Sequence, residues 1–259
     1  MMISKIFKPL SLMLSLFPFL AQASGYTFFA GVAHSTKIPE HTIGLIFVGS
    51  LILLAGFIYR TKTSRLSSSD VLVPAGDLSI RSFIEFFGEA IFKLVESIVG
   101  VKKANNYFPL AFAVFILVLV SNMLGLVPGF LPPTNNLNTT LALGLLVFLY
   151  YNVEGIRAVG AKKHFAHLLG PVWWLAPLML LVEIVSHLVR PVSLALRLRS
   201  NMEGDHMVVA TFTELTGLIV PVIFIFLGTL VCFIQAFVFT ILSLVYINLA
   251  IASHDHDDH

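Results

Sequence analysis

Residues 181–207 read LVEIVSHLVRPVSLALRLRSNMEGDHM, an apolar stretch that still contains many ionisable side chains. An arginine near the centre of a bilayer costs about 2.5 to 3.5 kcal/mol on insertion scales, so an ionisable residue there is a candidate functional group with a partner to be found. At about 100° per residue, several polar side chains fall within an arc of about 80° on one helix face. They are Glu183, His187, Arg190, Arg197 and Asn201. The stretch predicts a membrane helix with one polar stripe.

The composition places the whole chain in the membrane. Its 259 residues are 57% hydrophobic and 12% charged, and the mean hydropathy is +0.91. These values predict an all-α polytopic membrane protein with one membrane domain, residues 24–252. The net charge of +2 is too small to indicate nucleic-acid binding. A single cysteine, Cys232, excludes an intrachain disulfide and a cysteine-based metal site, and no cofactor motif is present, so we expect neither a cofactor nor a metal.

The first 23 residues are typical of a secretory signal peptide. Lys5 and Lys8 precede an apolar run that ends at Ala21-Gln22-Ala23, and we expect cleavage after Ala23. An uncleaved anchor is the alternative, but the run is short and contains Pro18, whereas a span needs roughly 20 apolar residues. Cleavage would leave the mature N-terminus outside the cytoplasm.

Three apolar runs predict the first three spans, at 42–59, 109–131 and 139–156. Basic residues follow the first and the third, which by the positive-inside rule marks those ends as cytoplasmic. Between the first two spans, residues 79–103 alternate phenylalanines with acidic and basic side chains at helical spacing. This pattern favours an interfacial amphipathic helix, and a helix packed on a soluble partner is the alternative.

The last two membrane segments are too long for helices that cross the bilayer upright. Residues 171–217 would form about 68 Å of helix, twice the thickness of the hydrocarbon core. Either this helix is steeply tilted, with a bend allowed near Pro191, or it is broken around Gly204. The final segment, 221–252, is also long, and a polar tail, 253–259, returns to the cytoplasm.

Arg197 gives the sharpest functional signal, because a guanidinium cannot escape the membrane cost by losing its proton. Its partner should be an acid, but Glu183 is about 21 Å away along the helix axis. We therefore predict that the acid belongs to another subunit, whereas Arg190 and Arg199 fit structural ion pairs or headgroup contacts. A purely structural ion pair remains the alternative for Arg197.

Two further groups of polar residues accompany the arginine. Gly228, Gln235 and Tyr246 share one face of the last helix, a face suited to packing against the Arg197 stripe; a simple interhelical hydrogen bond is the alternative for Gln235. His206, with Asp205 and Glu203, forms either a proton relay or a polar loop. A metal site joining these residues to the histidines of the tail is a weak hypothesis, because the two groups would lie at different depths.

The motif PVSLALRLRSN, residues 191–201, resembles the Pro-Val-Ser-Leu-x-x-Arg-Leu-x-x-Asn pattern of subunit a of the bacterial F-type ATP synthase membrane sector. IQAFVFTILSLVYINLA (234–250) and PTNNLNTTLALG (133–144) extend the resemblance, which covers about residues 40–252. It implies a multi-pass protein of the bacterial inner membrane without a catalytic site of its own, whose partners are a rotating subunit c ring, the peripheral stalk subunit b and the rest of the complex.

The resemblance also implies roles for single residues. Arg197 would face the ring carboxylates and separate two offset half-channels for protons. Gln235 would support that arginine, and Asn201 matches another polar position of the paths. The remaining matches are Glu183 and Ser193 nearer the cytoplasm, His206 in the outer path and Tyr246 low on the last helix.

The chain also departs from the family pattern. Arg199 and Ser200 stand where many members have an aromatic residue and a glycine, and Asn136 replaces a frequent aspartate. Gly228 stands where some members have a histidine or glutamate, so the outer path must use other groups or water. Two other classes remain open: a scaffold subunit with a buried arginine, and a secondary transporter, which the missing inverted repeat argues against.

Overall fold

The computed structural model describes residues 27–63, 80–127, 129–160, 176–216 and 219–252, and this part of the chain is helical with short connections. Five helices are long and apolar enough to cross a membrane, which confirms the predicted all-α polytopic class. They are α3 (Glu40–Thr63), α6 (Val101–Gly125), α7 (Leu137–Val159), α9 (Ala176–Thr216) and α10 (Ile219–Ala252). The predicted signal peptide and the polar tail lie outside the described residues.

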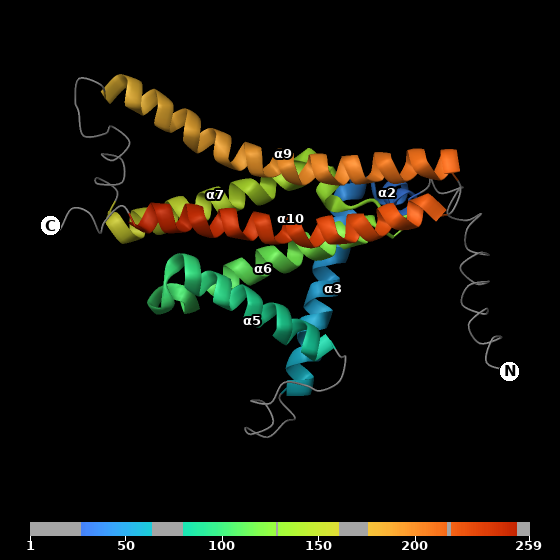
Figure 1. Cartoon of the computed structure of the whole chain (residues 1–259), viewed down its shortest axis with the longest axis horizontal. Coiled ribbons are helices and arrows are strands. Elements are labelled where there is room, and N and C mark those ends of the chain that lie inside the picture. The colour runs from blue at the N-terminus through green and yellow to red at the C-terminus, as the bar shows by residue number, and fades with distance from the viewer. Residues whose placement is uncertain (1–26, 64–79, 128, 161–175, 217–218, 253–259) are drawn as a thin grey trace.

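The two last helices form a long antiparallel pair. Figure 1 shows α9 and α10 side by side along the longest axis of the molecule, while α3 crosses them at a steep angle. The 41 residues of α9 make a helix of about 61 Å. The helix is continuous through Gly204 and includes Pro191 in its interior, so the prediction of a tilted helix fits and the broken one does not.

The core lies where α6, α7 and α10 pack together. Its largest fully buried side chains include Phe115, Tyr151 and Phe239. α7 meets α9 by a close approach of the two backbones, because a Cβ added to Gly144 would lie 2.8 Å from the carbonyl oxygen of Pro191. Glycine at position 144 therefore lets these two helices touch without a side chain between them.

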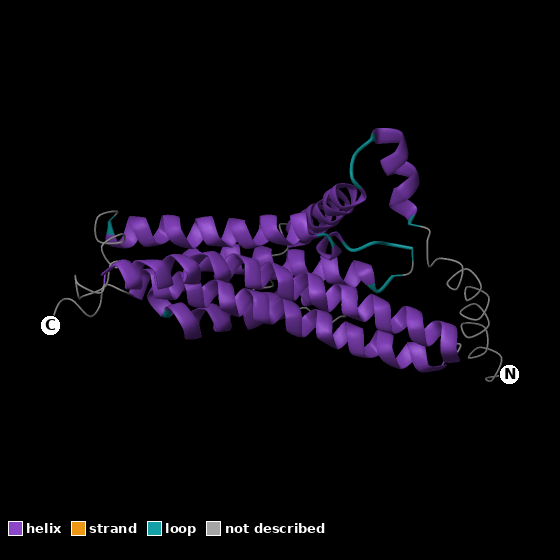
Figure 2. Cartoon of the chain, turned by 90° about the horizontal axis from the view of Figure 1, so that it is seen from above, coloured by secondary structure: helices purple, strands orange, loops and turns teal. Residues whose placement is uncertain are grey.

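The amphipathic segment forms α5 (Ile80–Val99), and its apolar face is partly covered by this chain itself. Phe87, Ile91 and Val95 are buried against α6 and α10, whereas Phe86 stays 68% exposed. α5 contacts α6, α10 and α3, and Figure 2 shows that helices make up nearly all of the described part of the chain. The predicted helix is confirmed, and part of the face that was expected to meet a membrane surface or a partner is packed intramolecularly.

Two features differ from the sequence prediction. The second span runs from Val101 to Gly125 instead of 109–131, so Pro109 lies inside the helix rather than at its start. A short helix that the sequence did not predict, α2 (Phe28–Thr36), packs its phenylalanine rings against Phe130. Gly129 makes this contact possible, because its φ of +87° suits glycine and an added Cβ would lie 2.6 Å from the ring of Phe28.

A short 3₁₀ turn, η1 (Pro133–Asn135), joins α6 to α7 and contacts α3 and α9. Its Thr134 hydroxyl donates a buried hydrogen bond of 2.9 Å to the Asn122 side chain of α6. The side chain of Asn136 caps α7 by accepting a bond from the backbone N–H of Asn138. This turn marks one end of the bundle and fixes the positions of α6, α7 and α9 there.

Candidate functional site

The guanidinium of Arg197 lies on an exposed part of α9. The neighbouring Leu196 is 46% exposed and Val192 is 44% exposed, whereas Leu198 is fully buried against the bundle. Within the described part of the chain, no carboxylate lies at ion-pair distance from Arg197. The arginine is thus carried on the surface of an apolar helix and points outside this subunit's core.

The two other arginines of the stretch have partners in the same chain. Arg199 Nε lies 3.4 Å from Glu203 Oε2, one turn along α9. Arg190 lies over the ring of Tyr246, 5.4 Å from the ring centre, in a cation–π contact between α9 and α10. Of the three arginines, Arg197 alone has no aromatic or acidic partner among the residues that the structure describes.

A direct hydrogen bond joins α9 to α10 beside Arg197. The Asn201 side-chain amide donates to Gln235 Oε1 at 2.6 Å, and Gln235 is only 4% exposed. Asn201 follows Arg197 by one helical turn, so the bond supports α9 next to the arginine. Gln235 Nε2 is buried and has no hydrogen-bond partner in the described part of the chain. The expected packing of the Gln235 face against the stripe is therefore present.

Toward the end of the bundle marked by η1, residues of α6, α9 and α10 meet in a group that we term the Asp205 cluster. Its members are Gly125 and Leu126 at the end of α6, Asp205 and His206 on α9, and Gly228 on α10. A Cβ placed on Gly228 of α10 would lie 3.9 Å from Asp205 Oδ2, and one placed on Gly125 of α6 would lie 3.2 Å from His206 Nε2. Both polar atoms are buried without a hydrogen-bond partner among the described residues. Glu203, Asp205 and His206 lie within the continuous helix α9, so the alternative of a polar loop is wrong.

Toward the opposite end, a second group gathers α7, α9 and α10, and we term it the Tyr151 cluster: Tyr151, Glu183, His187, Arg190 and Tyr246. Its ionisable pair is Glu183 and His187, with 3.4 Å between Glu183 Oε1 and His187 Nε2. Tyr246 lies beneath Arg190 and beside the ring of Tyr151. Ser193, on the turn between this cluster and Arg197, is exposed.

The polar side chains are thus arranged in order along α9. The Tyr151 cluster lies before Arg197, the Asn201–Gln235 bond lies beside it, and the Asp205 cluster follows. Sequence reasoning found Glu183, Ser193, His206 and Tyr246, and it left open what stands in for a side chain at Gly228. In the structure the Asp205 carboxylate lies next to Gly228, 3.9 Å from the position of an added Cβ. Tyr151 was missed, because a tyrosine in an apolar span gives no signal until its neighbours on another helix are known.

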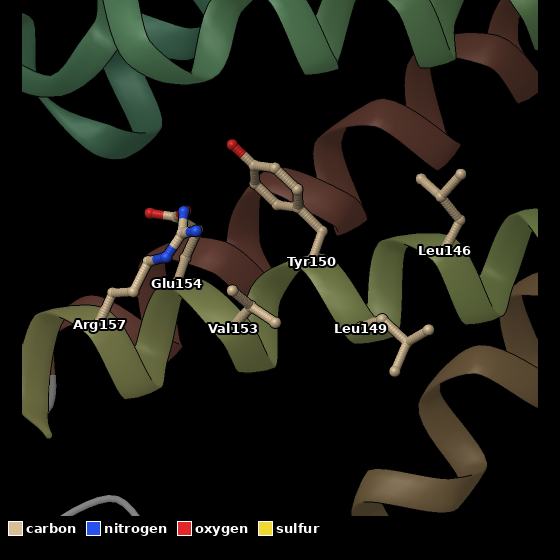
Figure 3. Close-up of a pocket in the computed structure, with 6 residues that line it drawn as sticks. All are labelled: Leu146, Leu149, Tyr150, Val153, Glu154 and Arg157. Atoms are coloured by element: carbon tan, nitrogen blue, oxygen red, sulfur yellow. The ribbon is translucent and has the colours of Figure 1, made fainter. Parts of the chain in front are cut away.

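A surface depression on α7 lies elsewhere and is not part of this arrangement. It has a volume of about 350 Å³ and is formed by one side of α7, including Tyr150, Glu154 and Arg157. Figure 3 shows Tyr150 and Glu154 rising from α7 on the side of the green ribbon, and Glu154 accepts a bond from Tyr107 of α6 and pairs with Arg157. These contacts are structural ones within the bundle.

Comparison with known proteins adds to this geometry. A family model described as ATP synthase A chain matches residues 42–248. The "ATP synthase subunit a" of Bdellovibrio bacteriovorus is 45% identical over 86% of this chain and 93% of its own length. That of Helicobacter hepaticus is 42% identical over 86% and 94%, and that of Sulfurimonas denitrificans is 37% identical over 89% and 98%. This chain, a multi-pass membrane protein with the five long apolar helices just described, therefore belongs to the ATP synthase A chain family.

Proposed function

We propose that this chain is the stator subunit of the rotary ATP synthase membrane sector. In this function it conducts protons to and from carboxylates on a rotating ring of subunit c, while the peripheral stalk subunit b holds it still. The mature N-terminus lies outside the cytoplasm and the C-terminus inside. The relatives named ATP synthase subunit a support the general assignment, and the arrangement of polar groups along α9 supports the mechanism.

The single observation that carries the proposal is the exposed Arg197. A permanent charge on the outer surface of an apolar helix is unfavourable unless something outside the subunit offsets it. A carboxylate on a neighbouring subunit that arrives at the arginine would lower this cost, because oppositely charged groups attract strongly in a low-dielectric region. Arg197 is thus suited to meet a partner carboxylate that has lost its proton.

The two clusters are suited to be two access paths on opposite sides of the arginine. The Tyr151 cluster contains Glu183 and His187, and the Asp205 cluster contains Asp205 and His206. Carboxylates and imidazoles exchange protons near neutral pH when water reaches them. One path therefore opens toward the cytoplasm through Glu183 and Ser193, and the other opens outside through Asp205 and His206.

Rotation follows from the different energies of the charged and neutral ring carboxylate. A deprotonated carboxylate is stable only beside Arg197, and a protonated one is stable in lipid. The guanidinium also repels a proton that would pass directly from one path to the other, which prevents a leak. A membrane potential supplies about 2.3 kcal/mol per charge per 100 mV to drive the exchange in one direction.

The arrangement of α9 and α10 favours this function over a secondary transporter. Transporters of that class bind substrate at helices broken near the middle of the membrane, whereas α9 and α10 are unbroken over the described ranges. A long, smooth pair of tilted helices is suited to lie along the curved face of a ring (Figure 1).

Replacing Arg197 by alanine tests the proposal in membrane vesicles that contain the complete complex. We expect Arg197→Ala to assemble and to lose ATP-driven proton pumping, measured by quenching of a pH-sensitive dye. Arg199→Ala is the matched control, because Arg199 lies two residues from Arg197 and its guanidinium pairs with Glu203 one turn further along α9, and it should keep most of the pumping. Normal pumping by Arg197→Ala would contradict the mechanism, and a failure of assembly would favour a scaffold function.

A further inference from the structure

Each ring nitrogen of His187 has a polar neighbour: Nδ1 has a hydrogen-bonding partner and Nε2 has an ion-pair contact. Nδ1 lies 3.0 Å from the hydroxyl of Tyr151 on α7, and Nε2 lies 3.4 Å from Glu183 Oε1 one turn earlier on α9. The His187 side chain is 17% exposed and that of Glu183 is 37% exposed, whereas Tyr151 is 1% exposed. Exposure thus falls stepwise from the carboxylate through the imidazole to the phenol.

We infer that His187 is a second proton-carrying side chain on the access path that begins at Glu183, and that Tyr151 is the positioning residue that aims its ring. This inference rests on the proposed function. It assigns a role to a residue of the polar stripe for which the resemblance implies none.

The geometry allows a balanced proton transfer between the two side chains. When Nδ1–H donates to the Tyr151 oxygen, Nε2 is the unprotonated nitrogen of the ring and lies 3.4 Å from Glu183 Oε1. A protonated Glu183 gives its proton to Nε2, so that an O–H bond breaks, an N–H bond forms, and a carboxylate and an imidazolium result. The imidazolium then releases this proton to water on the path toward Arg197, and the neutral ring is restored.

Tyr151 is suited to hold the ring and not to carry the proton. A phenol has an ordinary pKa of about 10, far from that of histidine at about 6.5, so it keeps its proton while the imidazole exchanges one. Its ring is also stacked at 6.1 Å on that of His187 and lies beside Phe148, which restricts the orientation of the imidazole.

The position of His187 along α9 shortens the distance that protons must travel in water. Four residues separate Glu183 from His187, about 6 Å of helix, and ten separate His187 from Arg197, about 15 Å. The charged and titratable groups around His187 are Glu183 and Arg190 from α9, Tyr151 from α7, and Tyr246 from α10. Arg190 lies over Tyr246, and the carboxylate of Glu183 lies 3.4 Å from Nε2 of the imidazole.

The test measures passive proton flux through membranes that contain the full complex, after the soluble catalytic sector is removed. His187→Gln keeps hydrogen-bonding groups but cannot take up a proton near neutral pH. We expect it to assemble, to lose most of the flux, and to lose the dependence of the flux on pH that a proton-carrying imidazole confers. A flux and a pH profile equal to those of the unmodified complex would overturn the inference.

Two adjacent tyrosines supply a matched pair of variants. Tyr151→Phe removes the hydroxyl that aims the imidazole, and we expect a lower flux. Tyr150→Phe removes the neighbouring hydroxyl on another side of α7 (Figure 3), and we expect no change. If His187→Gln fails to assemble, this pair decides, because equal flux in the two variants overturns the inference.

The outcome for Arg197→Ala separates this inference from the proposed function. Pumping that survives Arg197→Ala contradicts the stator mechanism itself. Pumping that is lost in Arg197→Ala, together with normal flux in His187→Gln, leaves the stator mechanism in place and overturns only the role of His187.

Discussion

Asn201 on α9 donates a hydrogen bond of 2.6 Å to Gln235 on α10, one helical turn from Arg197. Because the two amides act through one bond, removing either should have the same consequence as removing both. We expect Asn201→Ala and Gln235→Ala each to lower ATP-driven pumping, and the double variant to lower it no further than the worse single variant. Pumping rates in vesicles, normalised to the amount of assembled complex, give the comparison. Independent, multiplying losses would show that the two residues act separately.

The Asp205 carboxylate lies beside Gly228: a Cβ added to Gly228 would lie 3.9 Å from Asp205 Oδ2. This proximity leads to a second prediction. Gly228→Asp should lower proton pumping, because two carboxylates in one buried place cannot both ionise freely. The double variant Asp205→Gly with Gly228→Asp should recover part of the pumping, since it restores one carboxylate at nearly the same place. Gly228→Ala is the control for the added volume, because it introduces a Cβ without a charge. That Cβ would meet the flexible end of Leu126 at 3.1 Å. No recovery in the double variant would show that the carboxylate must be attached to α9.

The close contact of Gly144 with Pro191 predicts a large difference between two glycine variants. Gly144→Ala would place a Cβ 2.8 Å from a backbone oxygen, so α7 and α9 must separate, at a cost of about 1 to 3 kcal/mol. Gly204→Ala has nothing within 4 Å and replaces glycine inside a helix, so it should stabilise by up to about 1 kcal/mol. Thermal unfolding of the purified complex in detergent measures both, and an equal effect would contradict the tight contact.

The buried bond between Thr134 and Asn122 predicts a non-additive loss of stability. Thr134→Val leaves the Asn122 side-chain oxygen without this donor, at a cost of about 1 to 3 kcal/mol. The double variant Asn122→Leu with Thr134→Val removes both polar groups and should cost less than Thr134→Val alone. The midpoint of thermal unfolding is the measurement, and a larger loss in the double variant would show that packing, and not the hydrogen bond, dominates at η1.

Hydropathy was sufficient to predict the number of spans, because each apolar run has at least about the length that a helix needs to cross the hydrocarbon core. It was less accurate for the bounds of α6, because the first turns of this helix contain Lys102, Lys103, Asn105 and Asn106. The helix also passes through Pro109. The missing N–H of a proline inside a helix removes a single backbone hydrogen bond, a loss that neighbouring helices in a membrane bundle can compensate. Hydropathy also gave no signal for α2, whose order depends on packing against Phe130.

The candidate site was predictable within a helix and not between helices. The helical wheel predicted correctly that Gln235 faces the polar stripe of α9, where it meets Asn201. The prediction was possible because Asn201 and Gln235 each lie on a strongly patterned helix face. The proximity of Asp205 to Gly228 and of Tyr151 to His187 depends on how far α10 and α7 are shifted along α9, and no local pattern specifies that shift. The missing side chain at Gly228 was the available signal, since it shows that another group must occupy the space.

The contact between Gly144 and Pro191 has a mechanical consequence. In the proposed function, a rotor that pressed on Arg197 would exert a sideways force on α9, and α7 would bear it. A side chain between two helices can yield by changing rotamer, but here the two backbones meet directly, only six residues from Arg197. The subunit would thus be stiff close to the point where the force acts, and little of the work of each rotary step would be lost in deforming it.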